Sequence, residues 1–230
     1  MNSESEYSPK FYREHAQRYA RVSHEFLQSV YIRSTHPGLK GDLDLIEGLK
    51  KLIAPGAMGL DAGCGAGARD VFFYWKDGYS IVGVDAIEEN ILAARSMHPE
   101  IARQVSVFDL DQPLGYTDAH FDFVICNAVI QHIDPVIVKT VTLPEFVRVM
   151  KPAGVLQLMF KSGTGVTTIY DKDYNTDRTF QLYEVDEIVN VLVDLGMEII
   201  SAEGDGLGGI MFFTDPKPME HCVFYARKVN

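Results

Sequence analysis

The sequence MGLDAGCGAGARD, residues 58–70, places three glycines directly after a short apolar segment. Met58–Asp61 has the length and composition of a buried strand, and the apolar stretch after the loop is expected to be helical. Gly63, Gly65 and Gly67 let the backbone turn tightly and approach a ligand without a Cβ in the way. This order of strand, glycine loop and helix predicts the first unit of an α/β sheet whose loop binds a ligand.

Strands and helices alternate along the rest of the chain. Further strands are expected at Ser80–Asp85, Gln104–Asp109, Phe121–Asn127, Gly154–Phe160, Glu198–Ala202 and His221–Arg227. Helices are expected at Asp42–Ile53, Ile87–Met97, 135–150 and Glu184–Leu195, with Pro144 splitting the third and Gly196 ending the fourth. This pattern predicts an α/β fold with a doubly wound, mostly parallel seven-stranded sheet and helices on both faces. Since no helix separates the last two strands, we expect an antiparallel edge strand.

Two segments are expected to lie outside the sheet. Residues 10–34 place apolar side chains at helical spacing, and the run ends at a proline-glycine pair. This helix either packs on the body of the protein or closes over a ligand. We take residues 1–40 as an N-terminal helical lid on a Rossmann-like domain of residues 41–230. Residues 161–183 are long for a plain connection, so we expect them to cap the substrate.

Composition limits the classes of protein that remain. Of the 230 residues, 47% are hydrophobic and 23% are charged, which is usual for a globular domain. The formal net charge of −11 disfavours a nucleic-acid partner, because the protein and a phosphate backbone repel each other. Three scattered cysteines argue against a disulfide framework and a zinc cluster, so no metal is expected. We expect a cytoplasmic protein without membrane contact, because no signal peptide and no membrane-length apolar run is found. The sequence carries no prediction of the oligomeric state.

Polar residues end four consecutive strands at the edge where ligands bind in this architecture. They are Asp61, Asp85, Asp109 and Asn127. Asp61 would repel a pyrophosphate by several kcal/mol at about 5 Å, but it is well placed to hold an ammonium group or an amide. Asp85 lies where a carboxylate commonly accepts hydrogen bonds from both ribose hydroxyls. A ligand with a cationic amino group and without phosphates therefore fits this edge best.

Five segments of the chain follow one another in a familiar order and spacing. They are LDAGCGAGARD (60–70), IVGVDAIEENILAAR (81–95), VSVFDLDQPL (105–114), FDFVICNAVIQHI (121–133) and RVMKPAGVLQLMF (148–160). Together they resemble the class I S-adenosylmethionine-dependent methyltransferases of the small-molecule type. The usual Pro-Gly-Gly before the fifth strand is Pro152-Ala153-Gly154 here.

The resemblance implies S-adenosylmethionine as the cofactor and ten residues that bind it. Its methionine part would be surrounded by Asp61, Gly63, Cys64 and Gly65, with Asn127 near the sulfonium side. Its nucleoside would contact Asp85 through the ribose, Ala86 and Ile87 through the adenine face, and Asp109 and Leu110 through the adenine edge.

Methyl transfer requires mainly that the nucleophile, methyl group and sulfur are aligned in a dry site. A general base helps when the acceptor is a hydroxyl or a protonated amine. His132 is the candidate base, because it follows Asn127 by five residues and its usual pKa is near 6.5. The acceptor is expected to contact aromatic residues of the first helix and of the cap segment, namely Tyr12, Tyr19, Tyr170 and Tyr174.

The interpretation favoured by the sequence is transfer of a methyl group to an oxygen or nitrogen atom of a small molecule. A methyltransferase acting on tRNA or protein is one alternative. An NAD(P)-dependent oxidoreductase is another, because Gly63, Gly65 and Ala68 also satisfy the dinucleotide-binding pattern. The position of Asp61 and the absence of a Tyr-x-x-x-Lys pair weigh against it. A third alternative is a binding module that retains the cofactor pocket without transfer chemistry.

Overall fold

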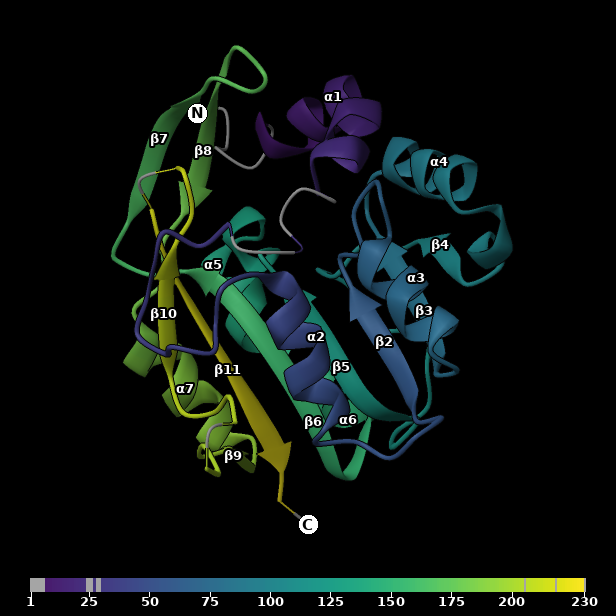
Figure 1. The fold of residues 1–230 in the computed structure, drawn as a ribbon, viewed down its shortest axis with the longest axis vertical. Helices are drawn as coiled ribbons and strands as arrows, with labels where there is room; N and C mark the ends of the chain where they lie inside the picture. Colours follow the sequence, from purple (N-terminus) through teal and green to yellow (C-terminus); the bar gives the residue numbers. More distant parts are fainter. Residues whose placement is uncertain (1–6, 24–26, 28–29, 205, 218, 230) are drawn as a thin grey trace.

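A nine-stranded sheet with helices on both faces forms the centre of the described structure (Figure 1). The computed structural model describes residues 7–23, 27, 30–204, 206–217 and 219–229. The strands are β1 (Arg33–Ser34), β2 (Met58–Ala62), β3 (Ser80–Asp85), β4 (Val105–Val107), β5 (Phe121–Asn127), β6 (Met150–Lys161), β7 (Val166–Asp171), β8 (Thr176–Gln181), β9 (Met197–Ile199), β10 (Met211–Thr214) and β11 (Glu220–Lys228).

Helices connect most of these strands. The α-helices are α1 (Tyr7–Ser23), α2 (Asp42–Lys50), α3 (Arg69–Lys76), α4 (Glu88–Met97), α5 (Pro135–Ile137), α6 (Leu143–Val149) and α7 (Val185–Asp194). Two 3₁₀ turns, η3 (Pro99–Ile101) and η4 (Ile130–His132), and one π-helical turn, η5 (Val138–Thr142), complete the set. No helix in the described part of the chain combines the length and apolar character that crossing a bilayer requires.

The order of the strands sets the position of the functional edge. Along the sheet the order is β1-β10-β11-β6-β5-β2-β3-β4, and β9 pairs with β11 beside this path. The strands β4, β3, β2, β5 and β6 are parallel, whereas β11 runs antiparallel to β6 and to β10. The chain leaves β2 toward β3 and β4 but leaves β5 toward β6 on the other side. The carboxyl ends of β2 and β5 therefore flank the topological switch point, where doubly wound folds bind ligands.

Two hydrophobic layers hold the helices against the sheet. On one face, α2, α3 and α4 bury side chains such as Leu45, Tyr74 and Ile91. On the other face, η5, α6 and α7 bury side chains such as Phe146 and Leu192. Because side chains alternate along a strand, each buried strand supplies apolar residues to both layers. The predicted α/β fold, with a mostly parallel sheet, an antiparallel edge strand and helices on both faces, is confirmed.

The sheet is larger than the seven strands predicted, because β1 and β10 extend it beyond β11. Both are short, with two residues in β1 and four in β10. The segment 161–183, expected to be a flexible cap, contains the antiparallel β7–β8 hairpin. The first helix ends at Ser23 and does not continue to residue 34, since Arg33–Ser34 pairs with β10. Residues 24–26 and 28–29 lie outside the described residues.

The helix predicted at 135–150, with a break at Pro144, is a continuous helical segment that contains a π-helical turn just before Pro144. The π-helical turn η5 lies between α5 and α6, and Pro144 occupies the first turn of α6. Proline cannot donate the backbone hydrogen bond of a regular helix, and a π turn shifts the bonding pattern by one residue. Upstream, Asp134 caps α5 by accepting a hydrogen bond from the Val136 N–H at 2.8 Å. The helical direction is thus kept through the proline.

Ala153 adopts a conformation that favours glycine. Its φ is +62°, in the left-handed region, near the start of β6. This is the position where the sequence has alanine in place of the second residue of Pro-Gly-Gly. A Cβ in the left-handed region costs roughly 1–2 kcal/mol, because it approaches the following carbonyl oxygen.

Ala153→Gly is therefore expected to raise the free energy of unfolding by about 0.5–1 kcal/mol, the relief of strain being partly offset by the flexibility of glycine in the unfolded chain. Urea denaturation measures the change. Ala102→Gly is the matched control, because Ala102 has a φ of −59°; there the substitution should lower stability by about 0.5–1 kcal/mol. Equal losses in both variants would contradict the assignment of strain to Ala153.

Candidate functional site

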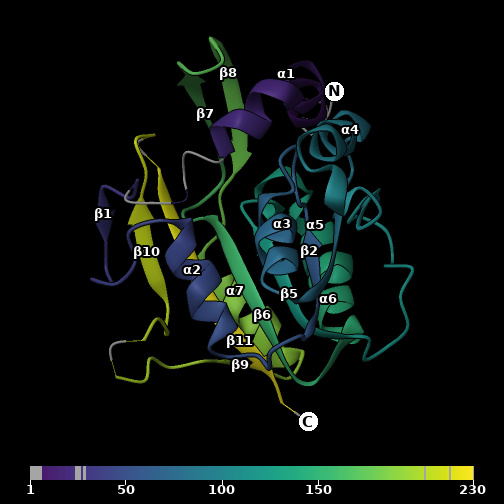
Figure 2. The same ribbon diagram turned by 45° about the vertical axis from the view of Figure 1, so that its right-hand side comes forward.

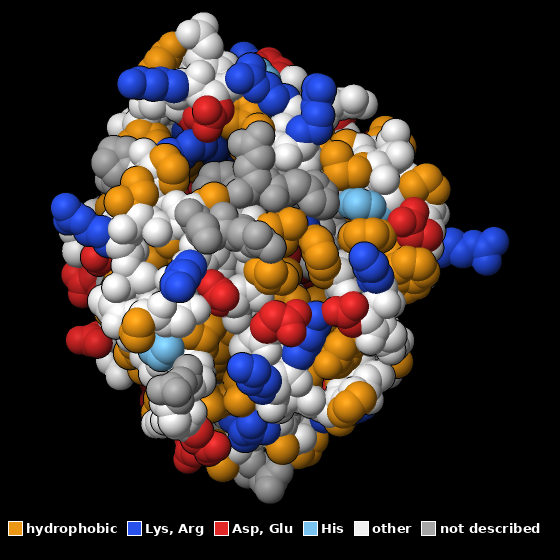
Figure 3. All heavy atoms as spheres, in the orientation of Figure 1, with side chains coloured by type: hydrophobic (Ala, Val, Ile, Leu, Met, Phe, Trp, Pro, Cys, Tyr) orange, Lys and Arg blue, Asp and Glu red, His pale blue; other side chains and the backbone are white. Residues whose placement is uncertain are grey.

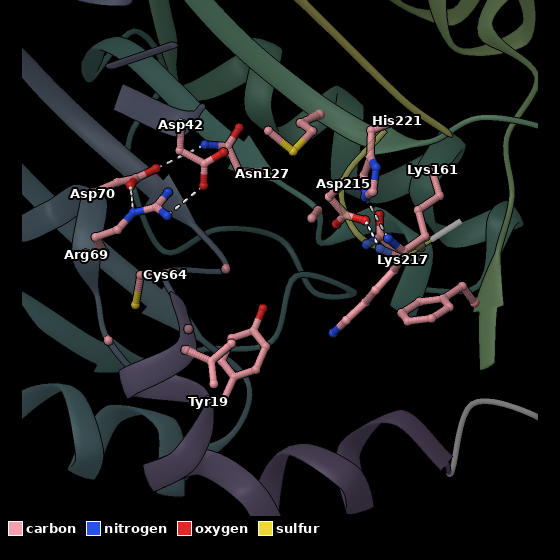
Figure 4. A pocket seen from close by; sticks show the side chains of 18 of the residues that line it. Tyr19, Asp42, Cys64, Arg69, Asp70, Asn127, Lys161, Asp215, Lys217 and His221 are labelled. Carbon is pink, nitrogen blue, oxygen red and sulfur yellow. Dashed lines mark hydrogen bonds and ion pairs between the residues drawn. The ribbon is translucent and has the colours of Figure 1, made fainter. Parts of the chain in front are cut away.

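A cavity opens at the carboxyl ends of β2, β5 and β6, and α1 and the β7–β8 hairpin contribute to its walls. Two groups of charged side chains lie on opposite sides of it (Figure 4). The acidic wall comprises Asp42, Asp61, Asp70, Arg69 and Asn127, and the basic wall comprises Lys161, Arg178, Asp215, Lys217 and His221. Figures 1 and 2 show α1 at this end of the sheet, next to α4.

The glycine loop exposes its backbone to the cavity. Its start is fixed because the N–H groups of Gly63 and Cys64 donate to the Val84 carbonyl at 2.8 and 2.9 Å. Gly63 has a φ of +92°, and a Cβ there would lie 2.3 Å from Cγ2 of Val129. Gly65 has a φ of +66°. Only glycine fits both positions without strain, and the result is a floor that a ligand can approach closely.

Asp85 ties this loop to the end of β3. One carboxylate oxygen accepts a hydrogen bond from the Gly65 N–H at 3.0 Å. The other accepts from the Ile87 N–H at 2.9 Å and from the Asn90 side-chain amide at 3.0 Å. A carboxylate can accept about four such bonds, so Asp85 keeps capacity for a ribose hydroxyl. Asp85 itself lies behind the loop and does not line the cavity.

Hydrogen bonds and ion pairs connect the acidic wall. Arg69 donates to Asp42 at 2.6 Å through Nη1 and to Asp70 at 2.8 Å through Nε. Asn127 donates to the other oxygen of Asp70 at 3.0 Å and accepts from Gln157 at 2.9 Å. The side chain of Asn127 at the end of β5 is thereby held between the first turn of α3 and Gln157 of β6.

Asp61 is buried beside this network. Burial, followed by the charge of nearby Asp70, raises the pKa of Asp61 well above its usual range. A buried carboxylate in this state gains stability when a cation arrives, because the cation offsets both unfavourable effects. Gln131 also lines the cavity, and its buried Oε1 has no hydrogen-bond partner among the described residues. The acidic wall therefore has acceptor atoms available for a cationic ligand that can donate hydrogen bonds.

The predicted residues of the nucleoside side lie apart from the cavity. Ala86 and Asp109 are exposed, whereas Ile87 and Leu110 are buried. All four follow β3 or β4 at the same edge of the sheet, but the cavity walls do not include them. By contrast, Asp61, Gly63, Cys64, Gly65 and Asn127 line it together, as the sequence predicted for the methionine side.

His132 lies behind Tyr12 and is not part of the cavity wall. Its Nε2 is 3.1 Å from the Tyr12 hydroxyl oxygen, which also accepts a hydrogen bond from Arg178 at 2.8 Å. Burial, together with the charges of Arg178 and Lys161, holds the pKa of His132 well below its usual value. In the neutral tautomer that carries its proton on Nδ1, the Nε2 of His132 accepts a hydrogen bond from the Tyr12 hydroxyl.

Three of the four predicted substrate tyrosines line the cavity. Tyr12 and Tyr19 reach it from α1, and Tyr174 reaches it from the turn of the hairpin. Their rings contact one another, with centroids 5.1 Å apart for Tyr12 and Tyr19 and 6.4 Å apart for Tyr19 and Tyr174. Tyr170 is 56% exposed, donates a hydrogen bond to Asn175 and lies outside the cavity.

The basic wall was missed by the sequence analysis. Lys161 ends β6, Arg178 lies in β8, and Lys217 and His221 flank the start of β11. Lys161 could have been found, because it ends the fifth strand just as Asp61 and Asn127 end earlier ones. Arg178 and Lys217 carried no such signal, since the hairpin and the loop before β11 were not predicted to approach the sheet edge.

Comparison with known proteins agrees with the observed fold. Residues 60–158 match the model of a methyltransferase domain family. The fold is similar to that of the 1,6-didemethyltoxoflavin-N1-methyltransferase of Burkholderia thailandensis, solved with S-adenosylhomocysteine bound, at a TM-score of 0.67 and 16% identity over 100% of this chain and 92% of that one. A TehB-like S-adenosylmethionine-dependent methyltransferase from Corynebacterium glutamicum gives a TM-score of 0.64 at 20% identity, over 96% of this chain and 100% of that one.

A third similar structure is the [4+2]-cyclase SpnF, with a TM-score of 0.67 and 16% identity over 98% of this chain and 96% of that one. The same fold thus occurs in a protein named for a different reaction, which agrees with the rule that fold alone does not determine activity. No curated protein sequence matches the chain.

Proposed function

Since the chain belongs to the class I S-adenosylmethionine-dependent methyltransferases, we propose that it methylates an oxygen or nitrogen atom of a small molecule. The observation that carries this proposal is the cavity itself. It places a glycine floor and an acidic wall on one side, and aromatic and basic side chains on the other. The first half suits the cofactor, and the second half suits an organic acceptor.

The residues of the acidic half fit S-adenosylmethionine. The cofactor carries an ammonium and a sulfonium group, and Asp61 and Asp70 are the carboxylates that would face them. Its carboxylate would meet Arg69, the guanidinium in this wall. Asp85 would accept a hydrogen bond from a ribose hydroxyl, and Ala86, Ile87, Asp109 and Leu110 would hold the adenine at the same sheet edge. The bare backbone at Gly63 and Gly65 leaves room for the chain of the methionine part.

The protein would contribute alignment and exclusion of water. When bound, the cofactor supplies a methyl group that an acceptor lone pair attacks, while the carbon–sulfur electron pair stays on sulfur. Tyr12 and Tyr19 of α1 and Tyr174 of the β7–β8 turn form one wall of the cavity, and they limit the directions from which an acceptor can approach. Such positioning provides much of the catalysis that a displacement with a good leaving group needs.

We propose that α1 acts as the lid of this site. It packs on the body through small side chains, with Ala16 and Ala20 against Ala66 and Ala93. Its aromatic residues reach the hairpin, where the centroids of the Phe11 and Tyr174 rings are 4.9 Å apart and the ring planes meet at 76°. Contacts of this size between a helix and its support are weak compared with a core layer, so the helix can open without unfolding the sheet.

His132 would take part in proton transfer only through Tyr12. The Tyr12 hydroxyl lies between the cavity and His132, and it can accept a proton from an acceptor while giving its own to Nε2. Arg178 on the same hydroxyl disfavours a positive imidazole, as the lowered pKa of His132 indicates. This route therefore matters for an acceptor that must lose a proton, and an acceptor that is already an anion does not need it.

Two alternatives to a small-molecule acceptor were a tRNA and a protein. The net charge of −11 disfavours RNA. The aromatic side chains that roof the cavity favour an acceptor small enough to be enclosed. The cytoplasmic location remains a prediction.

S-adenosylmethionine and S-adenosylhomocysteine are expected to bind with micromolar affinity in isothermal titration calorimetry, and NAD and NADP are not. Asp85→Asn should weaken binding by about 1.5–3 kcal/mol, because hydrogen bonds from the ribose to a charged acceptor become bonds to a neutral one. The exposed Asp194→Asn on α7 is the control and should bind normally. Tighter binding of NADH than of either sulfur compound would overturn the cofactor assignment.

For an acceptor that must lose a proton, His132→Gln should lower kcat and leave cofactor affinity nearly unchanged. The wild-type rate should fall only well below pH 6.5, because the imidazole stays neutral until the pH reaches its lowered pKa. Tyr12→Phe should cause a similar loss, and the double variant little more, since both residues serve one path. An acid limb that persists unchanged in His132→Gln would remove His132 from proton transfer.

Hydrogen exchange followed by mass spectrometry tests the lid. Amides of α1 are expected to exchange faster than those of β2 and β5 in the free protein, and to slow when S-adenosylhomocysteine is added. The helix α7, on the opposite face, serves as the internal control and should not respond. Slow exchange in α1 that does not depend on the ligand would leave it as a packing helix only.

A further inference from the structure

The basic wall contains a buried cation without a carboxylate partner. Lys161 is 6% exposed and lines the cavity at the end of β6. Its Nζ lies 2.7 Å from Nε2 of His221 and 4.7 Å from the centroid of the Phe180 ring. Among the described residues, no carboxylate oxygen forms an ion pair with it, and the charges of Asp215 and Asp171 act on it only from a longer distance. Burying an ammonium group without a counter-charge is costly, and burial lowers the pKa of Lys161 to about 7.

Two further cations of this wall share one carboxylate. Asp171, which is fully buried, accepts from Lys217 at 2.6 Å and from Arg178 at 3.2 Å. Despite the opposing effect of burial, the hydrogen bond from Lys217 keeps the pKa of Asp171 below its usual value, so the group is an anion. Burial raises the pKa of Asp215, and the charge of Lys161 opposes that shift. Lys217 also forms an ion pair with Asp173 at 3.6 Å. The ion pairs of this wall therefore involve Lys217 and Arg178, and none of them includes Lys161.

Flat side chains surround these cations. The Arg178 guanidinium lies 4.9 Å from the centroid of Phe180 and 4.3 Å from that of Phe11. Two polar atoms have no hydrogen-bond partner among the described residues, the Tyr174 hydroxyl and Nδ1 of His221. Both side chains are at least nine-tenths buried, and both line the cavity. Buried polar groups of this kind are normally satisfied, so they indicate that a ligand supplies the missing partners.

The helix α1, which contributes to the cavity walls, has more basic than acidic side chains on its exposed surface. Within α1, Lys10, Arg13, Arg18 and Arg21 are exposed, against Glu14 as the acidic residue. Figure 3 shows Lys and Arg side chains gathered at this end of the molecule. On a chain with a net charge of −11, this local excess would attract an anion toward the opening.

We propose that the methyl acceptor is an aromatic carboxylic acid, whose carboxylate binds Lys161 in the basic wall and whose ring lies against Phe180 and Tyr12. This inference rests on the proposed function, because it assigns the acceptor half of the same cavity. The acid supplies the ion-pair partner that Lys161 lacks and the hydrogen-bond acceptor that the Tyr174 hydroxyl lacks. A neutral or cationic acceptor would leave the ammonium of Lys161 buried and unpaired.

Binding of the acid is coupled to protonation of Lys161. At pH 8 most Lys161 side chains are neutral in the free protein, and a carboxylate beside the nitrogen raises the pKa so that a proton is taken up. At pH 6 most are already charged, and uptake is small. Affinity for the acid should consequently decline as the pH rises above 7.

The test uses the full chain saturated with S-adenosylhomocysteine. The probes are benzoate, 4-hydroxybenzoate and indole-3-acetate, each compared with its own neutral amide by isothermal titration calorimetry. We expect at least one acid to bind at least tenfold more tightly than its amide. At pH 8, titrations in buffers of different ionisation enthalpy should reveal uptake of nearly one proton, and much less at pH 6.

Variants locate the effect at Lys161. Lys161→Met should weaken binding of the acid at least tenfold and abolish proton uptake, whereas Lys161→Arg should retain most of the affinity. The exposed Lys51→Met is the matched control and should behave as wild type. The affinity of each variant for S-adenosylhomocysteine reports whether its fold and cofactor site are intact.

The outcomes separate this inference from the proposed function. Failure of the wild-type protein to bind S-adenosylhomocysteine would refute the function and the acceptor together. If S-adenosylhomocysteine binds but every amide binds as tightly as its acid, or no acid binds, the acceptor assignment alone is wrong. The acceptor assignment is also wrong if the wild-type protein takes up no proton when the acid binds at pH 8. This measurement uses the wild-type protein alone and does not depend on whether a variant folds.

Discussion

The carboxylate of Asp85 holds the glycine loop against the end of β3, and the shape of the cavity depends on that contact. One oxygen fixes the Gly65 N–H, and the other fixes the backbone at Ile87. With the loop in this position, Gly63 presses against Val129, and no side chain can occupy the floor. The loop then leads into α3, whose first turn places Asp70 between Arg69 and Asn127, the residue at the end of β5. The positions of the glycine loop, of the first turn of α3 and of the end of β5 around the cavity therefore all depend on the contact that Asp85 makes with the loop.

The cavity separates charges in a way that matches two different ligands. Carboxylates dominate the side that adjoins the glycine loop, and Lys161, Arg178 and Lys217 dominate the other side. A cationic cofactor and an anionic acceptor would each meet groups of opposite charge. Bound in this way, the two ligands would lie next to each other in the cavity. The protein keeps buried ionisable groups at a cost in stability, which is typical of sites where binding supplies the missing charges.

The sequence predicts the sheet well where each strand is a continuous apolar run that ends in a polar residue. The bounds of β3 and β5 are predicted to the residue for this reason. The β7–β8 hairpin escaped prediction because its strands, VTTIYD and TDRTFQ, are largely polar and expose one face. β10 was missed because it is only four residues long.

The residues of the candidate site that were predicted are likewise those that lie at the ends of apolar strands. Asp61 and Asn127 were found because each ends a predicted strand, and the structure places both in the cavity wall. Arg178 and Lys217 come from segments that only the tertiary structure brings to the sheet edge, through their shared contact with Asp171. Local sequence pattern carries no information about that contact. His132 was chosen for its distance along the chain from Asn127, which does not show that the ring of Tyr12 lies in front of it.

The most direct test of this account is a crystal structure of the chain with S-adenosylhomocysteine. The account predicts that the homocysteine part lies over Gly63–Gly65, with its amino group within hydrogen-bond distance of Asp61 or Asp70 and the ribose hydroxyls on Asp85. The space beside Lys161 would remain free for the acceptor. A ligand bound with its adenine against Lys161, or bound outside the cavity, would contradict the division of the site into a cofactor half and an acceptor half.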